Sequence, residues 1–264
     1  MTDHDIELRL TVACAIVRQA GQLARDYFHR RNNLEIELKG TQDLVSIADR
    51  AVEDLIRSQL AQAFPGDDII GEEGGTEVVR PDAPLWVIDP IDGTANFLRG
   101  MPYWSVALAL VIERQIVIGV TYDPVHDELF ATRRGHGATR DGQPIHVSNC
   151  TDPKQAVIGS TFTFKMKIDG YLELLHGVLY AGSDHRRLGS TALMMCHTAD
   201  GRLDGCATLY CNSWDVIGGL LLVQEAGGFV SDFLDGAELD QPNRALGCTP
   251  GLRSVIEPLL GFEA

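Results

Sequence analysis

Two aspartates three positions apart, Asp89 and Asp92, are the residues of this sequence with the clearest chemical potential. A short run of apolar β-formers, Leu85 to Ile88, comes directly before them and predicts a buried strand that ends at Asp89. Because Pro90 opposes regular continuation, we expect a tight turn that presents both carboxylates at a fixed place. Such a pair could bind a hard cation, since Mg²⁺ prefers oxygen ligands. The same spacing is also typical of a solvated surface turn.

Gly93 and Thr94 come next and could hold an anion. Their backbone N–H groups would begin a helix that runs through Asn96 and Phe97, and N–H groups at such a position suit a phosphate. A cation site and a phosphate site would then lie beside each other on one short turn.

Three further acidic residues stand at the ends of expected elements. Glu72 lies in a glycine-flanked turn, Asp49 lies near the start of a helix expected over residues 44–64, and Asp215 lies in the first turn of a helix expected over residues 214–226. Each has an ordinary interpretation, because loop glutamates are usually solvated and first-turn aspartates are favoured by the helix dipole. The functional interpretation is that buried elements aim these carboxylates at one place.

The composition excludes several classes of protein. Of 264 residues, 45% are hydrophobic and 22% are charged, which is ordinary for a globular chain. The 37 acidic and 22 basic residues give a formal net charge of −15, so we expect no nucleic-acid partner. No apolar run approaches the roughly 18 residues of a membrane span, and the first residues are too polar for a signal peptide. We therefore expect a cytoplasmic enzyme or binding protein that does not contact a membrane.

Cysteine and histidine offer no competing chemistry. The six cysteines form no Cys-x-x-Cys pair and are expected to be reduced and mostly buried. The eight histidines show no spacing typical of metal ligands. Chemistry is therefore expected from the carboxylates.

The elements that must position these acids alternate between helices and strands. Helices are expected over residues 6–28, 44–64, 167–177, 190–200 and 214–226, and from residue 250 onward. Strands are expected over residues 34–39, 85–89, 105–113, 115–123, 128–132, 137–141, 156–161, 205–210, 229–233 and 246–249, with a turn at 40–43 and a strand or loop at 179–184. Residues 74–84 are expected to form an irregular loop. The mixture predicts a layered α/β or α+β fold.

Several of these stretches together resemble the inositol monophosphatase family. They are Asp89-Pro-Ile-Asp-Gly-Thr94, Gly71-Glu72-Glu73, Trp214-Asp215 and Glu225-Ala-Gly-Gly228, with Asp43 to Asp49, Leu188 to Leu193 and Gly201 to Gly205 as further matches. The resemblance extends over nearly the whole chain. It implies a layered α/β/α/β/α sandwich of the inositol monophosphatase and fructose-1,6-bisphosphatase type. Residues 1–264 would form one domain in two closely packed halves, about 1–150 and 151–264.

The resemblance also implies Mg²⁺-dependent hydrolysis of small phosphate monoesters, with two to three ions in each active site. Glu72, Asp89 and the Ile91 carbonyl would hold one metal ion, and Asp89, Asp92 and Asp215 would hold a second. A third, weaker ion in this family binds the residue that matches Glu72. Two such ions suit the reaction, since one can activate a water while the other stabilises the leaving alkoxide.

The catalytic residues implied by the resemblance are Asp49, Thr94 and Glu72. Asp49 and Thr94 match the pair that orients the attacking water, and the N–H groups of Gly93 and Thr94 would receive the phosphate. The family also implies uncompetitive inhibition by Li⁺, tuned by the loop at 74–84, and a homodimer.

The sequence departs from the family where the alcohol part of the substrate would bind. Members that act on inositol phosphate typically carry a glutamate seven positions before the Trp-Asp aspartate, where this chain has Thr208. The family's common Gly-Ser/Thr-Ala triplet is here Gly189, Ser190 and Thr191. These four residues are expected to line the substrate pocket, with Thr208 at its wall.

The departure leaves the substrate open and the reaction unchanged. The first hypothesis is a phosphatase of inositol 1-phosphate or a similar polyol phosphate. Histidinol phosphate and nucleoside or sugar bisphosphates are alternatives handled by relatives of the same superfamily. A different class of function is a regulatory binding partner of another macromolecule, with phosphatase activity as a secondary property.

Overall fold

The computed structural model describes residues 1–31, 36–40, 43–76, 80, 83–235 and 238–261. Its strands are β1 (Ile36–Gly40), β2 (Asp43–Ser46), β3 (Asp68–Gly71), β4 (Gly75–Thr76), β5 (Leu85–Asp92), β6 (Ser105–Ile112), β7 (Gln115–Asp123), β8 (Glu128–Arg133), β9 (Ala138–Arg140), β10 (Gln143–Ile145), β11 (Val157–Ser160), β12 (Asp184–Arg186), β13 (Gly205–Cys211), β14 (Phe229–Val230) and β15 (Asn243–Cys248). Its helices are α1 (Asp3–His29), α2 (Ile47–Ala63), α3 (Thr94–Arg99), α4 (Ile168–Tyr180), α5 (Thr191–Ala199), α6 (Ser213–Glu225) and α7 (Arg253–Ile256), with 3₁₀ turns at Pro153–Gln155, Pro250–Leu252 and Glu257–Leu260.

The strands form three sheets. The large sheet has the order β10-β9-β8-β7-β6-β5-β3-β4, the smaller sheet has the order β12-β11-β13-β15-β14, and β1 pairs with β2. Within the large sheet, β5 is parallel to β3 and antiparallel to β6. All eight residues of β5 are buried, as expected for a strand covered on both faces.

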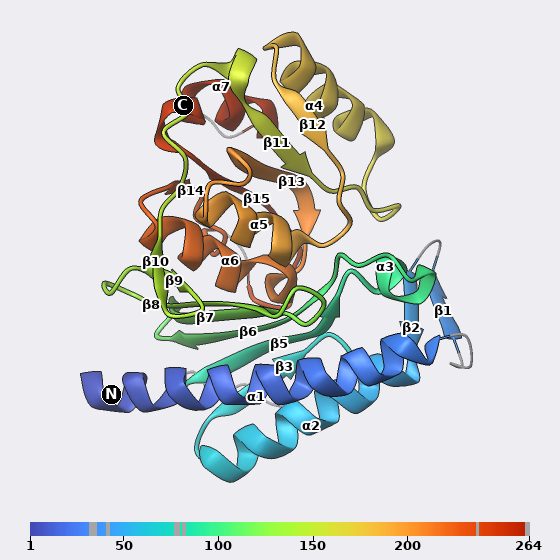
Figure 1. Ribbon diagram of the computed structural model, residues 1–264, viewed down its shortest axis with the longest axis vertical. Coiled ribbons are helices and arrows are strands. Elements are labelled where there is room, and N and C mark those ends of the chain that lie inside the picture. Colours follow the sequence, from blue (N-terminus) through green and yellow to red (C-terminus); the bar gives the residue numbers. More distant parts are fainter. Residues whose placement is uncertain (32–35, 41–42, 77–79, 81–82, 236–237, 262–264) are drawn as a thin grey trace.

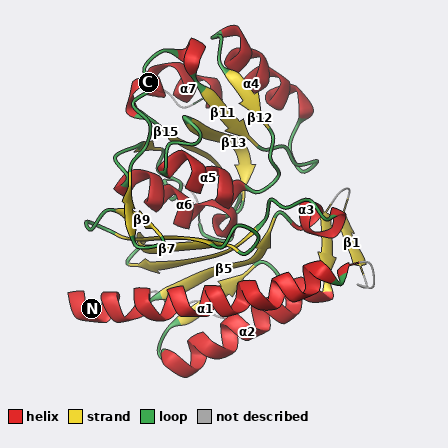
Figure 2. Ribbon diagram, viewed as in Figure 1, coloured by secondary structure: helices red, strands yellow, loops and turns green. Residues whose placement is uncertain are grey.

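Helices and sheets alternate in five layers, which confirms the expected α/β/α/β/α sandwich (Figure 1). The helices α1 and α2 cover one face of the large sheet, α5 and α6 lie between the two sheets, and α4 and α7 cover the outer face of the smaller sheet (Figure 2). Three clusters of buried apolar side chains fill the interfaces between the layers. Burial of apolar surface at these interfaces is the main stabilising contribution to such a fold.

The two sheets come from successive parts of the chain. The large sheet uses residues 68–145 and the smaller sheet uses residues 157–248, so the expected division near residue 150 falls between them. Helix α6 contacts strands of both sheets. That the two halves form one domain stays a prediction.

Two elements near the candidate site differ from the sequence-based expectation. The second helix begins at Ile47 instead of residue 44, because residues 43–46 pair with β1 and Ser46 caps the helix. Strand β5 does not end at Asp89. It continues through Pro90 to Asp92 with a shift of register against β6, which accommodates a residue that has no N–H to donate.

Elements farther from the site also differ. Helix α4 continues to Tyr180, and a strand follows at β12. The expected C-terminal helix is broken into three short turns, the last of which has Pro258 in its first turn. Parts of the strand expected at 34–39, the turn at 40–43 and the loop at 74–84 lie outside the described residues.

The cysteines and the helices agree with the sequence-based expectations. All six cysteines are free, and four of them are buried. None of the helices that the structure describes combines the length and the apolar character needed to cross a membrane.

Candidate metal and catalytic site

The end of β5 positions the first two carboxylates. Asp89 still pairs with Ala107 of β6, whereas Asp92 pairs with Ser105 after the register shift. The N–H of Ile91 donates to Asp89 Oδ1 at 3.1 Å, so the side chain of Asp89 closes the bulge that separates the two aspartates. Only 1% of Asp89 and 7% of Asp92 is exposed. The solvated surface turn is therefore excluded for this pair.

Helix α6 brings Asp215 to the same place. Asp215 is the third residue of the helix, and its Oδ2 accepts the N–H of Asn212 at 2.8 Å, which fixes the carboxylate at the helix N-terminus. Helix α6 packs so closely on β7 that a Cβ at Gly119 would clash with the carbonyl of Gly218. Ligand oxygens of Asp89, Asp92 and Asp215 all lie within 4.8 Å of one another.

The N-terminus of α5 holds Asp92. Ser190 Oγ donates to Asp92 Oδ2, the N–H of Ala192 donates to the same oxygen at 2.8 Å, and the N–H of Thr191 donates to Oδ1 at 3.2 Å. Ser190 is fully buried and also caps the helix. Ser190 and the backbone of Thr191 thus contact a carboxylate of the site, and their expected contact with the substrate stays a prediction.

Asp49 and Thr94 meet as the sequence analysis expected. Thr94 Oγ1 lies 3.2 Å from Asp49 Oδ1 and 3.0 Å from the carbonyl oxygen of Ile91. The second oxygen of Asp49 accepts the N–H of Ser46 at 2.8 Å and its hydroxyl at 2.7 Å. The hydroxyl of Thr94 carries one proton, so it can donate to only one of its two acceptors at a time.

Asp89, Asp92 and Asp215 form an acidic triad. Two glycines and Glu72 complete its surroundings. Gly93 has φ +98°, and a Cβ there would lie 3.1 Å from the carbonyl oxygen of Tyr103, so a side chain would be both strained and crowded. Gly189 has φ +90° and lies against the side-chain amide of Asn96. The N–H of Glu72 donates to the carbonyl of Ile88 at 3.3 Å, which places Glu72 beside the end of β5.

The acidic groups strongly affect one another. Burial, followed by the charge of Glu72 and those of Asp92 and Asp215, raises the pKa of Asp89 well above its usual value. Burial raises the pKa of Asp92 to about 6, against the effect of its hydrogen bonds, and burial with the Asp92 charge raises the pKa of Asp215 to about 7. Burial also raises the pKa of Asp49.

The raised pKa values and the oxygen ligands of these carboxylates fit a site for a hard divalent cation. Buried carboxylates that repel one another are stabilised by a positive ion at their centre. All the donors are oxygen atoms, which is the ligand type that Mg²⁺ prefers. Asp89, Asp92, Asp215 and Glu72 with the Ile91 carbonyl could hold such ions.

Thr208 lies in β13 and is fully buried. Its hydroxyl accepts a hydrogen bond from Thr161 Oγ1 at 2.7 Å and donates to the carbonyl of Tyr210 at 3.0 Å. The register of β13 against β15 shifts between Thr208 and Cys211, so these hydrogen bonds lie at a bulge. That Thr208 contacts the substrate stays a prediction.

Three supporting residues were not identified from the sequence. Ser46 holds Asp49, Glu53 binds the turn that carries Glu72, and Asn96 donates to the carbonyls of Tyr103 and Leu188 at 2.8 and 2.7 Å. For Ser46 the sequence contains a capping pattern, Ser-x-x-Asp, that could have predicted its contact with Asp49. For Glu53 there is only its position one helical turn after Asp49. No sequence pattern predicts the contact of Asn96 with Leu188, because the two residues are far apart in the sequence.

Comparisons with known proteins agree with this geometry. The model of the inositol monophosphatase family matches residues 5–259. An inositol-1-monophosphatase of Mesorhizobium japonicum is 40% identical over 87% of this chain and 86% of its own, and the Nus factor SuhB of Pasteurella multocida is 36% identical over 96% and 97%. The crystal structure of the extragenic suppressor protein suhB of Bartonella henselae superimposes with a TM-score of 0.90 at 32% identity and covers 97% of this chain and 100% of its own.

Proposed function

This chain belongs to the inositol monophosphatase family, and we propose that it is a Mg²⁺-dependent phosphatase of small phosphate monoesters, with inositol 1-phosphate and related polyol phosphates as substrates. The observation that carries the proposal is the convergence of three carboxylates, those of the buried Asp89 and Asp92 and of the half-buried Asp215, beside the hydrogen-bonded pair of Thr94 and Asp49. A binding module would have no need for this convergence of acids or for a hydroxyl that lies between two acceptors.

Each side chain has a distinct part in the proposed reaction. Mg²⁺ bound by Glu72, Asp89, Asp92, Asp215 and the Ile91 carbonyl would neutralise the charge of the phosphate and lower the pKa of the attacking water. The protein supplies the fixed geometry. Helix α5 orients Asp92 through three donors, and the capping interaction of α6 orients Asp215.

Thr94 and Asp49 would remove a proton from the attacking water. When the Ile91 carbonyl is engaged by another group, the single hydroxyl proton of Thr94 goes to Asp49, and the hydroxyl oxygen is then free to accept from a water. Asp49 can serve as the final acceptor of the proton because Ser46 holds its other carboxylate oxygen in place. The N–H groups of Gly93 and Thr94 would bind the phosphate.

The alcohol part of the substrate would bind beside the acidic triad, near Gly189, Thr191 and Thr208. Thr208 is buried, Thr191 donates its N–H to Asp92, and the contacts of Gly189, Ser190, Thr191 and Thr208 with the substrate are part of the proposal. Because Thr208 stands where relatives that act on inositol phosphate carry a glutamate, broad activity on small monoesters is expected, and histidinol phosphate or nucleoside and sugar bisphosphates stay alternatives. Inhibition by Li⁺, a homodimeric state and a cytoplasmic location belong to the same proposal by analogy with the family.

A second candidate function is that of a regulatory partner of another macromolecule. It is favoured by relatives that bear the name Nus factor SuhB, such as the protein of Pasteurella multocida. The acidic surface of this chain, with a net charge of −15, would favour a basic protein surface over nucleic acid as the contact. Both functions can coexist, since a macromolecule can bind the surface while Asp89 and Asp92 are buried.

The test is release of phosphate from a panel that contains inositol 1-phosphate, glycerol 2-phosphate, histidinol phosphate and a sugar bisphosphate. Activity is expected with Mg²⁺, none with EDTA, and none for Asp89→Asn at any Mg²⁺ concentration that supports the wild type. Circular dichroism of Asp89→Asn serves as the control for folding. No turnover of any member by a folded, Mg²⁺-supplied wild type would reject the enzyme and favour the regulatory role.

A further inference from the structure

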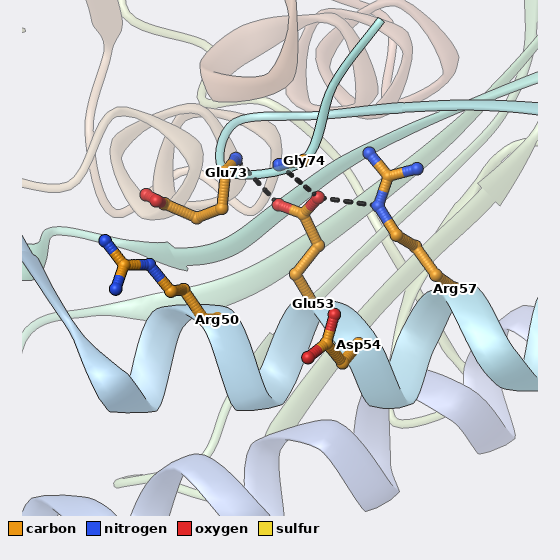
Figure 3. Close-up of a pocket in the computed structure, with 6 residues that line it drawn as sticks. All are labelled: Arg50, Glu53, Asp54, Arg57, Glu73 and Gly74. Carbon is orange, nitrogen blue, oxygen red and sulfur yellow. Dashed lines mark hydrogen bonds and ion pairs between the residues drawn. The ribbon is translucent and has the colours of Figure 1, made fainter. Parts of the chain in front are cut away.

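A buried carboxylate outside the acidic triad, that of Glu53, binds the turn between β3 and β4. Glu53 lies on α2 one helical turn after Asp49, and each of the two residues is only 1% exposed. Its Oε2 accepts the N–H of Glu73 at 2.8 Å, and its Oε1 accepts the N–H of Gly74 at 2.8 Å (Figure 3). The turn that it binds is the one that carries Glu72.

The charge of Glu53 is balanced locally. Arg57 Nε donates to Oε1 at 2.7 Å and forms an ion pair one turn along the same helix (Figure 3). A buried carboxylate without partners would be strongly unfavourable, whereas three donors and one opposite charge satisfy this one. Glu53 is therefore set to accept from the turn as a charged group, and hydrogen bonds to charged acceptors are stronger than neutral ones.

The sequence of the turn fits this contact. A Cβ at Gly71 would clash with the Glu53 carboxylate, and a Cβ at Gly74 would lie 2.7 Å from Glu53 Oε1 and 2.6 Å from an Arg57 nitrogen. Neither glycine has a positive φ, so close approach of the carboxylate explains their presence and backbone conformation does not.

The turn is also joined to the large sheet. Strand β4 has two residues and pairs with β3, at Ile70 with Thr76 and at Gly71 with Gly75. On the other side, the N–H of Glu72 reaches the carbonyl of Ile88 at a long 3.3 Å. The two hydrogen bonds from Glu73 and Gly74 to one carboxylate therefore fix the backbone that directly follows Glu72 to helix α2.

We propose that Glu53 is a positioning residue that holds Glu72 at the edge of the acidic triad and so strengthens metal binding. The proposal rests on the proposed function, because it assigns Glu72 to the metal site. It also makes α2 a common support, since the helix provides Asp49 to the Thr94 pair and Glu53 to the turn. Helix α2 thereby couples the proposed proton acceptor to a proposed metal ligand.

The test measures Mg²⁺ binding to the metal-free protein by calorimetry, independently of activity. Glu53→Gln keeps the shape and one acceptor oxygen but loses the charge and one acceptor. It is expected to weaken Mg²⁺ binding by about 10- to 100-fold, the usual range for loss of a group that supports a ligand. The kcat at saturating Mg²⁺ should stay near that of the wild type, which a general loss of structure would not allow.

The matched control is Asp54→Asn. Asp54 is the next residue of α2 and is exposed, and it lines a surface pocket together with Glu53 and Gly74 (Figure 3). This variant therefore removes one negative charge from the same part of α2 without removing a contact of the turn. Its Mg²⁺ affinity should equal that of the wild type. An equal loss in both variants would mean that long-range charge explains the effect, and the inference would be overturned.

A second variant acts from the side of the turn and covers the case in which Glu53→Gln does not fold. Gly74→Ala should displace the Glu53 carboxylate while Glu53 stays charged, and should also weaken Mg²⁺ binding. Wild-type affinity in folded Gly74→Ala, or in folded Glu53→Gln, would overturn the positioning role alone. Absence of Mg²⁺ binding by the wild type would instead overturn the proposed function, and this inference with it.

Discussion

Replacement of Asp215 by asparagine should stabilise the metal-free protein at neutral and higher pH while it removes metal binding. Asparagine has nearly the same shape and keeps an oxygen that can accept the N–H of Asn212, so the start of α6 is retained. The variant loses only the negative charge that repels Asp89 and Asp92. The prediction therefore separates the electrostatic cost of the site from its structural role.

The magnitude follows from the pKa of Asp215, which is about 7 in the folded protein against an ordinary 3.8. Between these two values the folded protein binds a proton that the unfolded chain does not. The free energy of unfolding therefore falls as the pH rises through this interval. Between pH 5 and pH 8 about two pH units lie within this interval, so the wild type loses about 3 kcal/mol of unfolding free energy. Asp215→Asn has no carboxyl at this position and does not show this loss.

The assay is urea unfolding of both proteins at pH 5 and pH 8 in the presence of a chelator. The quantity of interest is the difference between the two proteins at each pH, because groups remote from Asp215 titrate equally in both, and loss of its charge also relieves the repulsion on Asp89 and Asp92. Asp54→Asn, which removes an exposed charge from α2, controls for the general relief of an acidic protein with a net charge of −15. Saturating Mg²⁺ should raise the stability of the wild type at pH 8 and leave Asp215→Asn nearly unchanged.

Two results would refute this reasoning. If wild type and Asp215→Asn lose the same free energy of unfolding between pH 5 and pH 8, the carboxyl of Asp215 is not held at a raised pKa. If Asp54→Asn raises the free energy of unfolding at pH 8 as much as Asp215→Asn does, the stabilisation comes from the lower net charge and not from the acidic triad.

Three other substitutions test separate parts of the structure. Thr94→Ala should lower kcat by about 10²- to 10⁴-fold with an unchanged unfolding temperature, and an unchanged rate would remove the Thr94–Asp49 pair from catalysis. Thr208→Glu should destabilise the fold by several kcal/mol, on the order of 3–5, because it buries an unpaired charge, and improved turnover of inositol 1-phosphate in a stable variant would contradict the buried position. Gly119→Ala should cost about 1–3 kcal/mol of unfolding free energy by pushing α6 away from β7, and wild-type stability would disprove that close contact.

The sequence by itself determined the local chemistry of the site. The apolar run before Asp89 predicted a buried strand, the glycines predicted tight turns, and helix periodicity placed Asp49 and Asp215 near the starts of two helices. The order of these motifs also indicated the family and its layered fold. Such features depend on neighbours a few positions away, which is why they can be read without a structure.

Only the tertiary structure decided which of these groups meet and which way others face. Asp215 joins Asp89 because α6 packs on β7 through two glycines, a contact between residues about a hundred positions apart. Ser190 holds Asp92, and Thr208 lies at a bulge of β13, where its hydroxyl bonds to Thr161 and Tyr210. Alternation along a strand predicts which side chains face together only while the register is regular, and the register depends on the partner strand. Long-range pairing therefore sets the final orientation of side chains that local sequence leaves open.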